Sequence, residues 1–323
     1  MLDFADMKRD ALVRNLRRHI SGEVRFDHTS RRLYSTDASI YQVLPLGVVI
    51  PRTADDLVAA VQIAAELQVS IVPRGGGTSL SGQSIGPGMV IDCSKYLNAV
   101  LEIDPTARLA RVQPGVVLDQ LNRAAAVHGL QFGPEVATAS RANLGGMIGN
   151  NSAGARSIVY GKTCDHVRRL RVVLSDGTTA EFGPVGPEEW ARRTAGRGLE
   201  ADIYRDVGRI VLANADEIRH RFPRLIRRVS GYNLFDLLEE CPAGHNGNPL
   251  AELRETAGLH TLVIGGEGTL AVVAEAELAL IPRPKARGLL VPHFSSLDAA
   301  LDSLADCLEA QPSAVELMDS MLI

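Results

Sequence analysis

The chain has 323 residues, 46% of them hydrophobic, which is enough to bury a large core. Its 34 basic residues are outnumbered by 38 acidic ones, giving a formal net charge of −4 without any concentrated basic block. Nucleic acid is therefore not an expected partner, because binding a phosphate backbone needs a concentrated cationic face. No apolar stretch reaches the roughly 18 residues that a membrane span needs, and no signal-peptide core is present, so we expect a cytoplasmic protein.

The N-terminal 43 residues predict a charged segment that is helical over residues 7–20 and irregular afterwards. A layered α/β region is expected to begin at residue 44. There, Thr53 and Asp56 have the spacing of a capping box, and the apolar residues after them fall on one helical face. Three apolar runs predict the strands around this helix and the loop that follows it: residues 48–50, 69–72 and 89–91.

The loop before the last of these strands, residues 73–82, reads Pro-Arg-Gly-Gly-Gly-Thr-Ser-Leu-Ser-Gly. Glycines 75–77 can take φ > 0 and let successive N–H groups point into one concavity, while Thr78, Ser79 and Ser81 add hydroxyl donors. Hydrogen bonds to a charged partner are each worth roughly 1.5–3 kcal/mol, so a handful of them can hold a diphosphate. The loop predicts a cradle for a dinucleotide pyrophosphate, with a flexible glycine loop as the alternative.

Two better-known nucleotide motifs fail on this sequence. A Gly-x-Gly-x-x-Gly fingerprint starting at Gly75 would need glycine where Leu80 stands. A Walker A loop ending in the Gly-Lys-Thr at Gly161 would need glycine where Arg156 stands. Nucleotide hydrolysis is therefore not expected.

Later apolar patterns predict a second lobe. A strand over 100–103 ends the first lobe, and a turn leads from it to the second lobe. The second lobe is predicted to contain a strand over 109–113, a helix over 118–125, strands over 168–174 and 178–182, a helix over 203–218 and a loop over 239–249. A second glycine cluster, residues 143–154, would let the backbone lie flat against a planar ring, with Asn150 and Asn151 supplying amide groups to the ring edge. A small-residue packing surface is the alternative. A third cluster over 264–272 repeats this chemistry.

In order and spacing the three glycine clusters resemble the vanillyl-alcohol-oxidase type (PCMH-type) FAD-binding domain of FAD-linked D-2-hydroxy acid dehydrogenases, which act on D-lactate, glycolate or D-2-hydroxyglutarate. Residues 227–234 resemble a segment of bacterial fusions of such an enzyme with an iron–sulfur domain. The resemblance implies an α+β fold with a PCMH-type domain over residues 44–285, divided into α/β lobes over 44–104 and 105–285. It also implies FAD as cofactor.

By resemblance, the first loop binds the pyrophosphate, the second cluster runs beside the ribityl chain and flavin, and the third closes the adenine or ribityl side. The implied cofactor-binding residues are Pro73, Arg74, Gly75, Gly76, Gly77, Thr78, Ser79, Asn143, Gly145, Gly146, Gly149, Asn150, Ser152, Gly154, Gly161, Val167, Glu267 and Gly268. Relatives that attach FAD covalently commonly place histidine right after the first-loop glycines. Because Thr78 stands there, non-covalent FAD is expected.

Cysteine and histidine spacing predicts no metal site. The four cysteines are isolated, with no Cys-x-x-Cys pair, and are expected to be reduced, buried thiols: Cys93, Cys164, Cys241 and Cys307. The eight histidines share no metal-ligand spacing, and a structural role is the main expectation for His166.

Residues 286–323 predict a strand over 289–291, a helix over 297–308 and a strand over 314–317. This pattern resembles the beginning of the family's ferredoxin-like substrate (cap) domain, which in relatives continues into a histidine-rich metal motif and the substrate contacts. Those features are missing from the sequence, so we expect the chain to be a truncated part of a longer enzyme. No catalytic residue is assigned.

The function implied by the resemblance is oxidation of a D-2-hydroxy acid by hydride transfer to flavin N5. An iron–sulfur domain, a quinone or a cytochrome would accept the electrons, and peripheral attachment to the inner membrane stays open. Two alternatives remain. One is a non-catalytic FAD-binding electron-transfer subunit of a glycolate oxidase-like complex; the other is an enolpyruvyl sugar reductase, which residues 227–234 disfavour.

Overall fold

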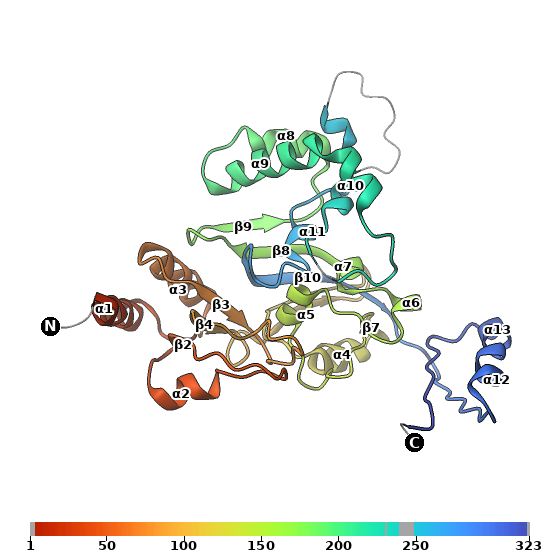
Figure 1. Ribbon diagram of the computed structural model, residues 1–323. Helices are drawn as coiled ribbons and strands as arrows, with labels where there is room; N and C mark the ends of the chain where they lie inside the picture. Colours follow the sequence, from red (N-terminus) through yellow and green to blue (C-terminus); the bar gives the residue numbers. More distant parts are fainter. Residues whose placement is uncertain (1–3, 230, 239–248, 322–323) are drawn as a thin grey trace.

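The computed structural model describes residues 4–229, 231–238 and 249–321, and it confirms the α+β class (Figure 1). Two sheets form the body of the molecule. The first has the order β1-β2-β4-β3, and the second has the order β5-β6-β10-β8-β9, with β7 pairing to β10. The predicted loop over 239–249 lies outside the described residues, except that Pro249 begins a short 3-10 helix.

The first sheet has the predicted strand, helix, strand, loop, strand order. Its strands are β1 (Glu23–Arg25), β2 (Gly47–Ile50), β3 (Ile71–Arg74) and β4 (Met89–Asp92). β2 and β3 both pair with β4 in parallel, so their carboxyl ends lie at one edge of the sheet. The helix α3 (Ala54–Glu66) connects β2 and β3, and Thr53 caps it by accepting from the Asp56 amide at 3.1 Å.

The N-terminal segment is more regular than the sequence indicates. After α1 (Phe4–His19), residues that were expected to be irregular form β1 and the short helix α2 (His28–Leu33). β1 pairs antiparallel with β2, and α1 packs on α3, with Leu12 and Leu16 fully buried in the same core as Leu57. Three-residue strands carry almost no periodicity of their own, which is why this one escapes a pattern search.

The second sheet is organised around one long strand. It contains β5 (Val100–Asp104), β6 (Leu109–Val112), β7 (Leu130–Phe132), β8 (Val167–Val173), β9 (Thr179–Phe182) and β10 (Val272–Pro282). β10 alternates between buried and half-buried residues and pairs antiparallel with β6, β7 and β8. The predicted lobe boundary after residue 104 is too late, because β5 pairs with β6 in this sheet.

Helices cover the second sheet and connect its strands. They are α4 (Leu118–Ala126), α5 (Leu144–Asn150), α6 (Ser157–Tyr160), α7 (Thr163–His166), α8 (Gly186–Thr194), α9 (Leu199–Ala213), α10 (Ala215–Arg221) and α11 (His260–Val263), with 3-10 turns at Leu234–Leu237 and Pro249–Glu252. The helix predicted over 203–218 is two helices, because Asn214 leaves the helical conformation between α9 and α10.

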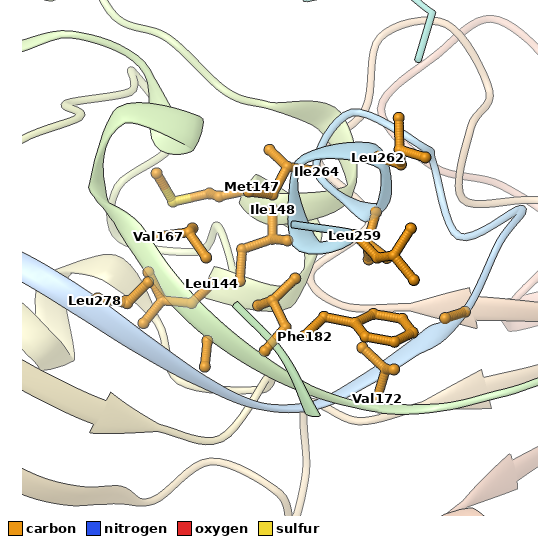
Figure 2. Packing of buried hydrophobic residues seen from close by; sticks show 14 of the residues in the cluster. Leu144, Met147, Ile148, Val167, Val172, Phe182, Leu259, Leu262, Ile264 and Leu278 are labelled. Carbon is orange, nitrogen blue, oxygen red and sulfur yellow. The ribbon is translucent and has the colours of Figure 1, made fainter. Parts of the chain in front are cut away.

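The glycine-rich helix α5 is anchored by its apolar face. Leu144, Met147 and Ile148 point into the main core, where Figure 2 shows them among side chains of the second sheet and of the segment that contains Leu259 and Ile264. Gly145, Gly146, Gly149 and Asn150 occupy the other positions of the helix and are half-buried or exposed. The core therefore fixes the helix, while Gly146 faces open space and Gly145 packs against Pro114.

The C-terminal residues contradict part of the prediction. The helices α12 (Leu297–Asp302) and α13 (Leu304–Glu309) form, but the apolar runs at 289–291 and 314–317 are not strands. Leu289 is 90% exposed, and Figure 1 shows this region apart from both sheets. A strand needs a partner for its backbone groups, and no described segment lies alongside these runs to supply one.

Candidate functional site

A cavity of about 870 Å³ lies where the loop after β3 faces α5 and the turn before β10. Most of the residues singled out in the sequence line it: Pro73, Arg74, Gly75, Gly76, Gly77, Thr78, Ser79, Asn143, Gly145, Gly146, Gly149, Asn150, Ser152, Glu267 and Gly268. The three glycine clusters, far apart in the chain, are thus brought to one cavity. Its size falls in the range of about 300–1,000 Å³ that is usual for small-molecule and cofactor sites.

The first loop presents free backbone donors. Among the described residues, none of the amides from Gly75 to Leu80 donates to a protein acceptor, although all six residues line the cavity. Consecutive free N–H groups in a concave turn form an anion-binding site. Ser79 contributes differently, because its Oγ accepts from the amides of Ser81 and Gln83 at 3.3 and 3.4 Å and so holds the turn itself.

The glycines of this loop are needed for two distinct reasons. Gly77 has φ +64°, which glycine adopts without strain, whereas Gly75 and Gly76 do not have positive φ. A Cβ on Gly76 would instead overlap the carbonyl oxygen of Arg141. The expectation of φ > 0 thus holds for Gly77, and close approach to a neighbouring backbone explains Gly76.

Arg74, one of the implied cofactor-binding residues, lines the cavity but directs its guanidinium to backbone oxygens of the wall. Its guanidinium donates to the carbonyl oxygens of Thr36 at 2.8 Å and of Tyr34 and Ser84 at 3.3 Å, and it stacks on the Tyr34 ring. Burial lowers the pKa of Arg74, and the nearby Asp92 carboxylate opposes that effect. Arg74 therefore braces the cavity wall, and the free amides of the loop are available to an anion.

Asn143 has one satisfied and one unsatisfied side-chain atom. Its Nδ2 donates to the carbonyl oxygen of Gly115 at 2.6 Å, while its buried Oδ1 has no hydrogen-bond partner among the described residues. That oxygen lies beside the loop, since a Cβ on Gly75 or Gly76 would lie 3.0 or 3.2 Å from it. An unpaired buried acceptor is costly, and a donor from a bound group would satisfy it.

The opposite wall is held by backbone contacts between the second and third clusters. The amide of Glu267 donates to the carbonyl oxygen of Gly149 at 2.9 Å, and Asn150 Nδ2 donates to Glu267 Oε1 at 3.3 Å. Glu267 has φ +52°, a conformation that a non-glycine residue adopts only under constraint. Burial raises the pKa of its carboxyl group, while the hydrogen bond from Asn150 acts in the opposite direction.

Three residues implied by the resemblance do not line the cavity. Gly154 packs against the carbonyl oxygen of Glu135, Gly161 has φ +74° beside Asp165, and Val167 is buried in β8. Their contact with a cofactor stays a prediction.

Sequence reasoning missed the wall built by the N-terminal segment. Thr36, Asp37 and Ala38 line the cavity, and the Ala38 amide donates to the carbonyl oxygen of Gly77 at 3.0 Å. Burial acts to raise the pKa of Asp37, but hydrogen bonds from Ser39 and Ser84 outweigh it, so the pKa is lowered. The short Ser/Asp/Ser pattern around Asp37 marks a turn and gives no sign of a cavity wall.

The described residues contain no cluster of histidine, cysteine and carboxylate side chains able to hold a metal ion. Cys93 is buried, and burial raises its pKa to about 12; burial likewise raises the pKa of the half-buried Cys164 to about 11. Cys307 is also half-buried and free, and Cys241 lies outside the described residues. His166 packs edge-on against Phe132.

Within the ranges described, no helix has the length and apolarity to cross a membrane.

Comparison with known proteins agrees with this geometry. Residues 45–183 match the model of the FAD binding domain family. The chain is 36% identical to D-2-hydroxyglutarate dehydrogenase of Pseudomonas putida, covering 94% of this chain and 29% of that protein. It is 30% identical to glycolate oxidase subunit GlcD of Bacillus subtilis, and the match covers 93% of this chain and 52% of that protein. The chain thus spans about a third to a half of these relatives.

A solved structure shows the same fold. Alkyldihydroxyacetonephosphate synthase is 19% identical, has a TM-score of 0.63, and is matched over 97% of this chain and 47% of its own. The residues that line the cavity fit the group that the family name states. Free loop amides suit a pyrophosphate, and a glycine-faced helix leaves room for a flat ring, since a Cβ on Gly146 would meet nothing within 4 Å.

Proposed function

Taking residues 45–183 as an FAD-binding domain, we propose that the chain holds FAD in the 870 Å³ cavity and serves the oxidation of a D-2-hydroxy acid. The observation that carries the proposal is the run of free amides from Gly75 to Leu80 opposite the bare glycine face of α5. When bound, FAD supplies the two-electron acceptor for the oxidation. The residues of this chain bind and orient it.

In this proposal the loop amides hold the pyrophosphate, and the hydroxyl of Thr78 adds a donor. Asn143 Oδ1 accepts a hydrogen bond from the cofactor, which removes the cost of its burial. The Gly145, Gly146 and Gly149 face of α5 leaves room for the ribityl chain and flavin, and Asn150 with Glu267 closes that side. Arg74 holds the Thr36 wall in place without touching phosphate.

The attachment of FAD is proposed to be non-covalent. The cavity wall carries Thr78 directly after the first-loop glycines, and Cys93, the cysteine that lines the cavity, is a buried thiol whose raised pKa keeps it un-ionised. Neither group is a nucleophile near neutral pH.

The substrate proposal rests on the relatives, whose printed names include D-2-hydroxyglutarate dehydrogenase and D-lactate dehydrogenase. The electron acceptor is proposed to be an iron–sulfur domain, a quinone or a cytochrome. The test is anaerobic mixing of FAD-saturated protein with D-2-hydroxyglutarate and D-lactate, with the L enantiomers as controls. Loss of the oxidised flavin absorbance with a D acid, and not with its L enantiomer, supports dehydrogenation of a D-2-hydroxy acid.

A second candidate is an FAD-binding subunit that functions only with a partner protein. The similarity to a glycolate oxidase subunit favours it. Flavin that dithionite reduces but no hydroxy acid reduces would select this candidate. A protein that binds no FAD at all would exclude both.

A further inference from the structure

A second cavity, of about 610 Å³, adjoins the candidate FAD cavity but is separate from it. It is bounded by α4, β7 and the stretch that follows β10. One segment divides the two cavities: Glu135, Ala139 and Ser140 line the second, while residues 136–138 and Arg141 line the first. None of the residues that the family resemblance implies lines the second cavity.

Guanidinium groups dominate the charge of this cavity. Arg123, Arg283 and Arg287 line it, together with two carboxylates, Asp119 and Glu135. Glu135 already pairs with Arg156 at 2.6 Å, from outside the cavity lining, and lies 3.8 Å from Arg287. The remaining lining therefore carries more positive than negative charge.

Two of these arginines lack a carboxylate partner within the described part of the chain. Arg123 Nε donates to the carbonyl oxygen of Asp119 at 3.2 Å, and the guanidinium of Arg283 forms no hydrogen bond or ion pair. Surface arginines elsewhere in the molecule differ, since Arg209 pairs with Asp206 and Arg221 with Glu217 on their own helices. Free guanidinium donors in one concave site match the geometry of carboxylate and phosphate oxygens.

From this charge and geometry we propose that the second cavity is a binding site for a small anion that carries more than one carboxylate or phosphoryl oxygen pair. Arg123 and Arg283 bind the anion directly, and Arg287, held by Gln131 Oε1 at 3.4 Å and by Glu135, borders it. The site is independent of the proposed FAD function, because the two cavities share no lining residue.

The experiment is calorimetric titration of FAD-saturated protein with citrate and, separately, with inorganic phosphate, at an ionic strength held constant with sodium chloride. The comparison is between the wild type, the double variant Arg123→Gln with Arg283→Gln, and the control Arg209→Gln, whose side chain is exposed on α9. Arg123 and Arg283 are exposed too, so the double variant should keep its melting temperature, which is measured in parallel.

We expect at least one anion to bind, with affinity reduced about tenfold or more in the double variant and unchanged in the control. Tighter binding of citrate identifies a polycarboxylate as the ligand class, and tighter binding of phosphate a phosphoryl group. Equal affinity in the double variant, or no binding of either anion, would overturn the proposal. FAD-free protein is titrated in parallel, and binding that appears only there would also overturn the proposal, because it would belong to the loop amides of the first cavity.

Discussion

Arg74 Nη2 donates to the carbonyl oxygen of Thr36 at 2.8 Å, joining the glycine loop to a stretch of chain 38 residues earlier. The same guanidinium reaches two further carbonyl oxygens, so the loop and the N-terminal wall form one unit. An arginine beside a phosphate loop would ordinarily be assigned to the phosphate. Here donors on both terminal nitrogens of the guanidinium are already used by backbone oxygens.

Arg74→Lys should weaken FAD binding although the positive charge is kept. A lysine ammonium is compact and cannot span three carbonyl oxygens, so the wall at Thr36 loosens and the part-buried carbonyl groups of Tyr34 and Ser84 lose donors, at about 1–3 kcal/mol of stability. Flavin titration and urea unfolding would show both losses. The control is Arg209→Lys. Unchanged FAD affinity in Arg74→Lys would refute the bracing role.

Gly76→Val should reduce FAD affinity about tenfold or more. The new Cβ overlaps the carbonyl oxygen of Arg141, so the loop must shift and its amides lose their common direction. Flavin titration measures the affinity, and circular dichroism confirms that the fold persists. If the variant binds FAD as the wild type does, the loop is not the pyrophosphate site.

FAD should leave the protein on denaturation. Because Thr78 replaces the histidine of covalent relatives, acid precipitation of the yellow protein should release all flavin into the supernatant. The flavin absorbance of the supernatant and of the redissolved pellet measures how much FAD is released. Colour that stays in the pellet would show a covalent bond and contradict the non-covalent proposal.

His260 should make the protein less stable in mild acid. Burial first, and then the charges of Arg169 and Arg168, lower its pKa from 6.5 to about 4. The folded state therefore disfavours the proton that the unfolded state takes up, so stability is complete above pH 6.5 and is lost as the pH falls from 6.5 toward 4. The loss should reach about 2 kcal/mol near pH 5.

Urea unfolding at several pH values measures this loss, with His260→Asn as the variant and His128→Asn, an exposed position, as the control. The slope of stability against pH should flatten between pH 6.5 and 4 in His260→Asn only. If the slope of stability against pH in His260→Asn equals that of the wild type, groups other than His260 cause the acid sensitivity.

The contribution of the glycine clusters to a cavity could be predicted, because it depends on the local sequence alone. A cradle at 73–82 and a flat surface at 143–154 follow from missing Cβ atoms, and both line the cavity. The hydrogen-bond partners of the Arg74 guanidinium could not be predicted, because they are backbone oxygens that only tertiary packing brings near it. The same holds for the wall at Thr36–Ala38, which carries no motif.

The strands at the edges of the fold show the same limit. β5 pairs with its sequence neighbour β6, but β6 joins the second sheet by pairing with the distant strand β10, so the predicted lobe boundary falls one strand late. The apolar runs at 289–291 and 314–317 look like strands in sequence, yet a strand forms only where a partner lies alongside. Local pattern gives the type of an element, and long-range pairing decides whether it forms.

The most direct test of the central claim is a parallel FAD titration of the wild type and Gly146→Leu. A side chain at position 146 meets no protein atom within 4 Å of its Cβ, so it leaves the core under α5 intact and enters only the space proposed for the cofactor. Gly288→Leu, where a Cβ also meets nothing, is the matched control outside the cavity. We predict that the wild type and Gly288→Leu bind one FAD per chain, while Gly146→Leu keeps its melting temperature and binds FAD about tenfold or more weakly. Equal FAD affinity in a folded Gly146→Leu, or no FAD binding by the wild type, would contradict the proposed site.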